Sequence, residues 1–148
     1  MNKTYDGLPQ DCWPLKWTTI HEHLQNAGVS WQIFQNATNQ YAENIILGFA
    51  NFKYANTSSP LYQHAVLKDE NTSMDQFMNL AKEGNLPQVS FLIADQELSE
   101  HAPWLPRDGG WFQTQVAEAV MSGKSWEDTV VIFSYDGKVI QGLDLPKC

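Results

Sequence analysis

The sequence has few basic residues and no long apolar run, and each shortage excludes a class of protein. Nine lysines and arginines stand against seventeen aspartates and glutamates in 148 residues, so the formal net charge is −8. A chain this acidic has no broad positive field to attract a phosphodiester backbone, and we therefore predict no nucleic-acid partner. No window reaches the roughly eighteen consecutive apolar residues that a membrane span requires, so we predict no transmembrane segment.

Cysteine frameworks and the common catalytic motifs are also lacking. Two cysteines, Cys12 and Cys148, are too few and too peripheral for a set of disulfides or a metal knuckle. The chain contains no Gly-rich phosphate loop, no GxSxG elbow, no HExxH motif and no Cys/His pairing. It therefore has no self-evident nucleophile.

The signals that bear on localisation disagree with one another. The first twenty residues lack an apolar signal core and a small-residue cleavage site, so they predict no entry into the secretory pathway. Four glycosylation sequons would nevertheless suit a secreted protein, and they begin at Asn2, Asn36, Asn56 and Asn71. The residues alone leave the compartment open.

What is present is the composition of one globular domain, with 43% hydrophobic and 18% charged residues. Two capping boxes, Thr19 with Glu22 and Ser73 with Gln76, predict helices that end near Gly28 and Gly84. Two further helices are predicted over residues 41–52, with Ile45, Phe49 and Phe52 on one face, and over residues 111–121.

Three short apolar segments alternate with these helices, and strands are predicted at 29–34, 89–93 and 129–134. The second and third are apolar almost throughout, as strands buried on both faces are. Helices alternating with buried strands predict an α/β layered fold around a mainly parallel sheet.

A long polar loop, residues 94–110, follows the second predicted strand and is a candidate for function because of its length. Ligands of parallel sheets bind beyond the carboxyl ends of the strands. Glu100 and His101 lie in this loop, and Asp136 lies two residues past the third predicted strand. If the two strands are neighbours, His101 and Asp136 share one crevice, where they could ligate a divalent metal or bind an oxyanion.

Ordinary structural roles compete with that hypothesis. A loop histidine beside a glutamate is usually solvated or locally hydrogen-bonded, and aspartate before glycine is common turn chemistry. His21 and His23 lie on different faces of their predicted helix, where they do not easily share an ion. Of the six tryptophans, Trp104 alone falls in the candidate loop, and the others are better explained by packing.

Three blocks of the sequence stand out, and they are WTTIHEHLQNAGVSWQIFQ, LPQVSFLIADQELSEHAPWLPRDGGWFQTQVAEAV and SWEDTVVIFSYD. They resemble successive parts of the phosphoesterase family, which holds bacterial and fungal phospholipase C and acid phosphatase enzymes. The SEHAP stretch and the SYD end resemble the fungal branch especially. The resemblance divides the chain into an irregular lead-in, a partial phosphoesterase domain and a divergent tail, at residues 1–13, 14–136 and 137–148.

The resemblance implies an alkaline-phosphatase-like α/β/α fold that hydrolyses phosphate monoesters or diesters, commonly those of phospholipid headgroups. In the family, the histidine of the EH motif belongs to the phosphate-handling site, and His101 occupies that position here. The aspartate of the family's YDE motif is a metal ligand, and the matching residue is Asp136. The resemblance therefore implies a divalent metal ion of unstated identity, and together with the sequons it favours secretion.

Two departures from the family pattern bear on activity. Family members carry an upstream Asn-rich metal-binding stretch and a catalytic Ser or Thr, which this chain lacks, and residues 137–148 replace the acidic residue, Gly-Gly turn and Asp-His pair that follow YD. We therefore expect the C-terminal half of a catalytic domain, truncated before the last ligands and weakly active or inactive alone. Two alternatives stay open: a non-catalytic remnant that binds phosphate or phospholipid headgroups, and a gene-model fragment without independent function.

Overall fold

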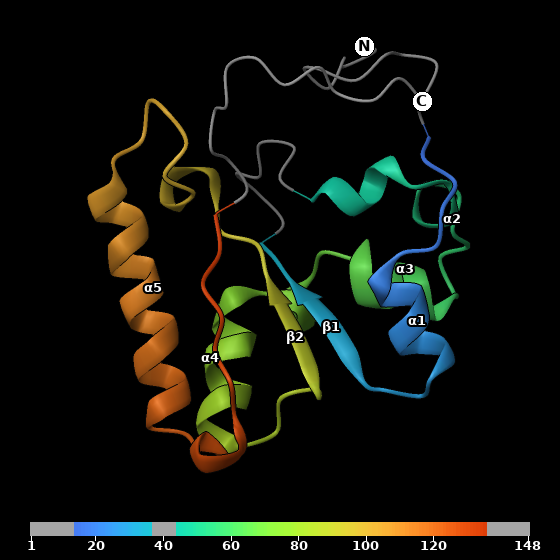
Figure 1. Cartoon of the computed structure of the whole chain (residues 1–148). Helices are drawn as coiled ribbons and strands as arrows, with labels where there is room; N and C mark the ends of the chain where they lie inside the picture. Colours follow the sequence, from blue (N-terminus) through green and yellow to red (C-terminus); the bar gives the residue numbers. More distant parts are fainter. Residues whose placement is uncertain (1–13, 37–43, 136–148) are drawn as a thin grey trace.

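The computed structural model describes residues 14–36 and 44–135, in which helices flank a small parallel sheet. The helices and strands, with single-turn 3₁₀ helices marked η, are α1 (Ile20–Asn26), β1 (Trp31–Phe34), η2 (Ile45–Gly48), α2 (Ala50–Lys53), α3 (Pro60–Ala65), η3 (Glu70–Thr72), α4 (Met74–Glu83), β2 (Val89–Leu92), η4 (Gln96–Leu98), α5 (Pro106–Met121) and η5 (Trp126–Asp128). In Figure 1, α4 and α5 lie on one side of the strands and α1, α2 and α3 on the other. The predicted α/β class with a parallel sheet is confirmed.

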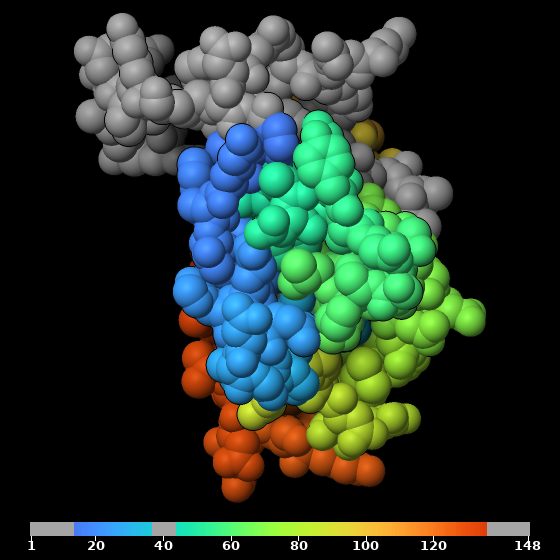
Figure 2. Space-filling view, turned by 90° about the vertical axis from the view of Figure 1, so that its right-hand side faces the viewer, coloured from blue at the N-terminus to red at the C-terminus, as the bar shows by residue number. Residues whose placement is uncertain are grey.

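The two strands pair in parallel, with Trp31 opposite Val89 and Phe34 opposite Leu92. Side chains of a strand point alternately to its two faces, so β1 supplies both halves of the core. Phe34 packs against α4 and α5, whereas Trp31 and Ile33 pack against the elements on the other face. There, α1 lies beside the segment that carries α2 and α3 (Figures 1 and 2).

Both capped helices form, and the predicted capping box is complete at Thr19, whereas only the Ser73 side-chain bond is present at the start of α4. The Thr19 hydroxyl accepts a hydrogen bond from the backbone of Glu22, whose carboxylate accepts one from the Thr19 backbone in return, at 3.3 and 2.9 Å. At the start of α4, Ser73 Oγ accepts from the backbone of Gln76 at 3.2 Å. The helix α4 ends at Gly84, which adopts the left-handed conformation that favours glycine.

The prediction of one helix over residues 41–52 is wrong within the described part. Residues 45–53 form η2 and α2, which are separated by an extended Phe49. The break has a partner, because Leu15 donates to Gly48 O at 2.8 Å and accepts from Ala50 N at 2.9 Å. The register changes as a result, so Ile46 is buried and Ile45 is 67% exposed.

The helix predicted at 111–121 begins five residues earlier, at Pro106. Proline is favoured in the first helical turn because its fixed φ suits a helix and its missing N–H would have had no partner there. The sequence prediction placed the start too late because Gly109 and Gly110 are adjacent and glycine is a poor helix former. The loop before α5 is correspondingly shorter than expected, and η4 occupies part of it.

Burial of the other predicted strands differs from expectation. Each residue of β2 is partly exposed, because β1 is its single hydrogen-bonded neighbour among the described strands. The prediction of a strand at 129–134 is wrong, because these described residues are not assigned as a strand and do not pair with β2. Val131 packs on the core between α4 and α5, whereas Val130 and Ile132 are 85% and 81% exposed, so only one side of this segment is covered.

None of the helices in residues 14–36 and 44–135 combines the length and the apolar content that a bilayer crossing needs.

Two histidines pack against Trp31 in the core beneath α1 and α3. The ring centroids of His21 and His64 lie 5.2 and 5.1 Å from that of Trp31, and His21 lies 4.4 Å from Phe91. No described group hydrogen-bonds the buried Nδ1 atom of either histidine. Burial lowers the pKa of both histidines, although Glu22 partly opposes the shift at His21.

Stability is therefore expected to fall in mild acid. Below pH 6.5 the unfolded chain takes up protons at these positions before the folded chain does, so the free energy of unfolding declines as the pH falls from 6.5 through the lowered pKa values. Urea denaturation at several pH values from 8 to 5 measures this slope. His21→Phe keeps an aromatic ring and removes one titrating group, so it should flatten the slope. His23→Gln, at an exposed position of α1, is the matched control, and an equal flattening there would contradict the assignment.

Candidate functional site

Polar side chains gather where β1 and β2 end, as the parallel pairing requires. Asn36 follows β1 and Asp95 follows β2, and Asn36 Nδ2 donates to Asp95 Oδ2 at 2.8 Å. Asn36 Oδ1 also accepts from the Met74 backbone at 3.1 Å, which satisfies one of the unpaired N–H groups at the start of α4. One amide thus joins both strand ends to a helix.

His101 lies in the turn between η4 and α5, with its backbone held on both sides. Ser99 Oγ accepts from His101 N at 3.3 Å and donates to Gln96 O at 2.8 Å. On the other side, Trp104 N donates to His101 O at 3.0 Å. Main-chain contacts with η4 and Trp104 therefore fix the position of this residue in the loop.

The exposed imidazole of His101 has a defined hydrogen-bonding pattern. Its Nδ1 lies 2.7 Å from the carbonyl oxygen of Ala102. A carbonyl can only accept, so Nδ1 carries the proton and Nε2 lacks one in the neutral ring.

Three side chains meet beside His101. Glu100 Oε1 accepts from Gln113 Nε2 at 3.1 Å and from the Tyr135 hydroxyl at 3.2 Å. Gln113 Nε2 also donates to the Tyr135 hydroxyl at 2.8 Å, which closes a triangle between the loop, α5 and the segment after η5. Residues 35 positions apart in the chain are therefore in direct contact.

Of the two candidate residues named from the sequence, the structure describes one. His101 is described, whereas Asp136 lies outside the described residues. Glu100 and Tyr135, the residues immediately before them, form the hydrogen bond just described. Sequence reasoning missed Gln113, because residues 109–110 were assigned to a loop; on a helix, Gln113 lies one turn beyond Gly109 on the same face.

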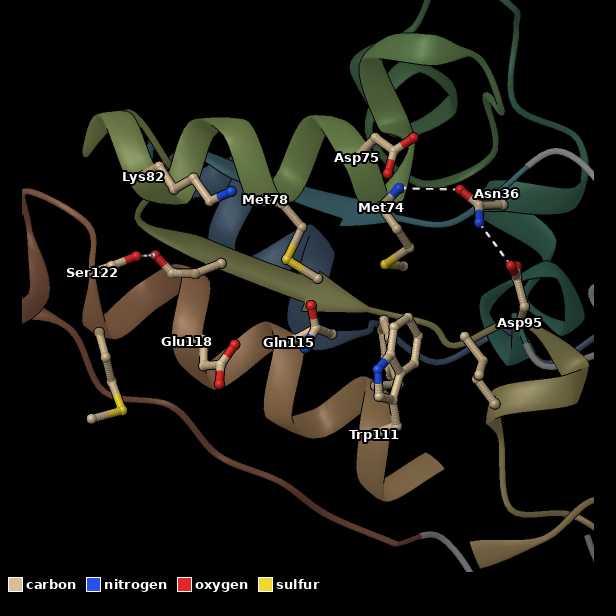
Figure 3. A pocket seen from close by; sticks show the side chains of 14 residues that line it. Asn36, Met74, Asp75, Met78, Lys82, Asp95, Trp111, Gln115, Glu118 and Ser122 are labelled. Carbon is tan, nitrogen blue, oxygen red and sulfur yellow. Dashed lines mark hydrogen bonds between the residues drawn. The ribbon is translucent and has the colours of Figure 1, made fainter. Parts of the chain in front are cut away.

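Two hollows lie near these groups. A broad hollow of about 1750 Å³ runs over the face of β2, and its lining includes Glu100, His101 and Tyr135. A narrower groove of about 770 Å³ lies between α4 and α5, and His101 does not line it. Figure 3 shows Met78 and Gln115 facing one another across this groove, with Asn36 and Asp95 at one end.

The described part of the chain contains no complete set of metal ligands. Within residues 14–36 and 44–135, no three His, Cys, Asp or Glu side chains cluster closely enough to hold an ion. The described residues therefore do not by themselves form the metal centre that the resemblance implies. No catalytic step can be derived through a metal from these residues.

The fold and the edge it builds define a class: an α/β chain whose parallel strands bring polar loops together at their carboxyl ends. The model of the phosphoesterase family matches residues 1–138. This chain therefore belongs to the phosphoesterase family.

Bacterial phospholipases C are among its relatives. The chain is 32% identical over 142 residues to a non-hemolytic phospholipase C of Burkholderia pseudomallei, covering 81% of this chain and 20% of the relative. It is 32% identical over 158 aligned positions to a hemolytic phospholipase C of Pseudomonas aeruginosa, covering 91% and 21%. Phospholipase C B of Mycobacterium tuberculosis is 28% identical over 125 residues, covering 81% and 24%. The chain thus spans a fifth to a quarter of the length of these relatives.

Asn36 is expected to couple the strand edge to α4. Asn36→Ala removes one hydrogen bond to Asp95 and one to the Met74 backbone, so we expect it to lower the free energy of unfolding by about 1–3 kcal/mol. Chemical denaturation measures the change. A cycle with Asp95→Ala separates the pair, because the two losses should be less than additive if the contact exists in solution. Asn26→Ala, at an exposed position of α1, is the control, and full additivity would contradict the coupling.

Proposed function

We propose that this chain contributes to a phosphate-ester hydrolase site in which His101 handles the phosphoryl group and Asp136 supplies a carboxylate. The proposal carries the two roles over from the phosphoesterase family to the matching positions of the EH and YD motifs. It concerns a shared site at the carboxyl edge of the sheet, to which other parts of a larger catalytic domain also contribute.

The contact between Glu100 and Tyr135 is the observation that supports this proposal most directly. Its hydrogen bond of 3.2 Å joins the residue before His101 to the residue before Asp136. Two motifs that are distant in sequence therefore approach one another at the strand edge, where ligands of parallel sheets bind. The exposed His101 ring also faces a hollow large enough for a small phosphate ester.

The chemistry proposed for His101 follows from its ring. With Nδ1 donating to Ala102 O, Nε2 is the nitrogen proposed to face the phosphoryl group. A protonated imidazole stabilises the negative charge of a phosphoryl oxygen, and a neutral one can accept a proton. Asp136 is proposed as one carboxylate ligand of a divalent cation, whose other ligands the described residues do not supply.

The substrate class is proposed as a phosphate ester, of which a phospholipid headgroup is the first choice because relatives are named phospholipase C. Acid phosphatase activity and a place in the fungal branch belong to the same proposal. The named relatives come from bacteria, so they support the hydrolase class and not that branch. Secretion is likewise part of the proposal, motivated by the sequons.

Binding without turnover is the second candidate function. The described residues hold no metal-ligand cluster, and the chain matches only about a fifth of the phospholipase C of Burkholderia pseudomallei. A site of this kind acts as a unit, and losing central members commonly removes several orders of magnitude in rate. If other central groups of the family site are absent, the strand edge would bind phosphate or a headgroup without cleaving it.

Hydrolysis of p-nitrophenyl phosphate and of p-nitrophenyl phosphorylcholine tests the proposal, with and without divalent metal and chelator. We expect weak turnover that depends on metal, and a loss of about 10²–10³ in rate for His101→Ala because a charge-stabilising group is removed. Asp136→Ala should reduce turnover and weaken the metal dependence. The relative rates on the two substrates distinguish a phosphomonoesterase from a phosphodiesterase.

His23→Ala, an exposed histidine on α1, is the matched control and should leave turnover unchanged. Calorimetry with inorganic phosphate separates the remaining outcomes. Binding that His101→Ala abolishes, without turnover, would favour the non-catalytic function. A chain that neither binds nor cleaves would contradict both, and a chain that also fails to fold would support the gene-model fragment.

A further inference from the structure

We propose that Glu100 is a positioning residue whose carboxylate ties the His101 loop to α5 and to Tyr135, and so sets the orientation of His101. This inference deepens the proposed function, since it matters for catalysis only if His101 handles phosphate. The tie itself can be tested without any ligand. Four features of the structure carry it: a backbone angle, a glycine, a hydrogen-bonded triangle and a shared offset in sequence.

The backbone of Glu100 is unusual for its residue type. Its φ is 62°, in the left-handed region, and among the non-glycine residues that the structure describes it alone has a positive φ. A glutamate is disfavoured in this region, where glycine and asparagine are common. The conformation therefore persists because contacts of the side chain compensate for it. The same angle determines the direction in which the chain enters His101.

Gly109 provides the space that the Glu100 side chain occupies. A Cβ atom added at Gly109 would lie 2.2 Å from Glu100 Cγ and 2.7 Å from its Cδ. These distances are far too short for any residue with a side chain unless the glutamate moves. The neighbouring Gly110 has no atom within 4 Å of its equivalent position. A side chain at Gly109 would therefore displace the Glu100 side chain, whereas one at Gly110 would not.

The triangle determines what the carboxylate does. Glu100 Oε1 accepts from two donors, one on α5 and one on the segment after η5. A carboxylate oxygen that is packed over a helix and bound to two donors acts within the fold, so we assign it no contact with substrate. Its effect on chemistry passes through the next residue in the chain, His101, which is why it is a positioning residue.

The offset in sequence extends the argument to the second motif. Glu100 precedes His101 and Tyr135 precedes Asp136 in the sequence, so this hydrogen bond joins the residues that come immediately before the two motif residues. If the Glu100 carboxylate is removed, Gln113 can still donate to Tyr135, but both lose their hydrogen bond to the His101 loop. Loss of the Glu100 carboxylate should therefore change the orientation of His101 more than it changes the stability of the fold.

The adjacent glycines provide the test. Gly109→Ala places a methyl group where the Glu100 side chain lies, whereas Gly110→Ala adds the same group one residue later on the same helix, in open space. The first readout is the ¹⁵N and ¹H signals of the His101 ring in the 148-residue chain without ligand. We expect these signals to shift in Gly109→Ala and to stay at their wild-type positions in Gly110→Ala.

Variants of Glu100 show whether the effect passes through its carboxylate. Glu100→Gly tolerates the left-handed backbone and lacks the tie, so its His101 signals should shift as those of Gly109→Ala do. Glu100→Gln keeps an oxygen acceptor and should restore the wild-type signals. The double variant Glu100→Gly/Gly109→Ala should shift no further than Glu100→Gly alone, because the two substitutions break the same contact. Tyr135→Phe should give a smaller shift, with the exposed Tyr54→Phe as its control.

Titration with inorganic phosphate is the second readout. If the proposed function holds, Glu100→Gly and Gly109→Ala should weaken phosphate binding by about 3- to 10-fold, the range for one lost hydrogen bond, with Gly110→Ala and Glu100→Gln unchanged. If the wild-type chain does not bind phosphate, the proposed function is contradicted. The positioning role of Glu100 is then tested by the His101 ring signals alone. Unchanged ring signals in Glu100→Gly, or equal shifts in both glycine variants, would overturn the positioning role.

Discussion

The parallel pairing of β1 with β2 is the constraint on which the rest of this structure depends. Because the strands run in the same direction, both end at one edge, and the loops that follow them are forced into proximity. Asn36, the His101 turn and Glu100 all lie in or beside those loops. An antiparallel pairing would send the two loops to opposite edges, and neither the bond between Asn36 and Asp95 nor a common crevice could form.

The fold could be predicted from sequence where the signal was local. The caps at Thr19 and Ser73 and the stop at Gly84 depend on residues within one turn of each other, and each formed as expected. Predictions failed where a distant partner decides the conformation. Leu15 interrupts the helix predicted over 41–52, and nothing within that segment announces the interruption. The apolar pattern of 129–134 indicates a preference for extended backbone, but it does not indicate whether a neighbouring strand will pair with it.

The candidate site divides in the same way. The position of His101 beyond a strand could be predicted, because it follows from chain direction and strand order. The group of residues that holds the loop could not be predicted. Glu100, Gln113 and Tyr135 come from three separate segments, and each is of a type that is common on protein surfaces. A pair of glycines predicts a loop in sequence, although both lie inside α5 and one of them, Gly109, makes room for the Glu100 side chain. The role of Asp136 stays a prediction, since that residue lies outside the described structure.

The double hydrogen bond of Asn36 also bears on how this chain could be modified. Asparagine-linked glycans attach through the amide nitrogen of a sequon, and Asn36 begins one of the four in this chain. In the folded protein that nitrogen is committed to Asp95, and the side chain is wedged between the end of β1 and the start of α4. Asn56 and Asn71, which begin two of the other sequons, are exposed. Folding would therefore close the first of these three sites to a glycosylating enzyme while leaving the other two open.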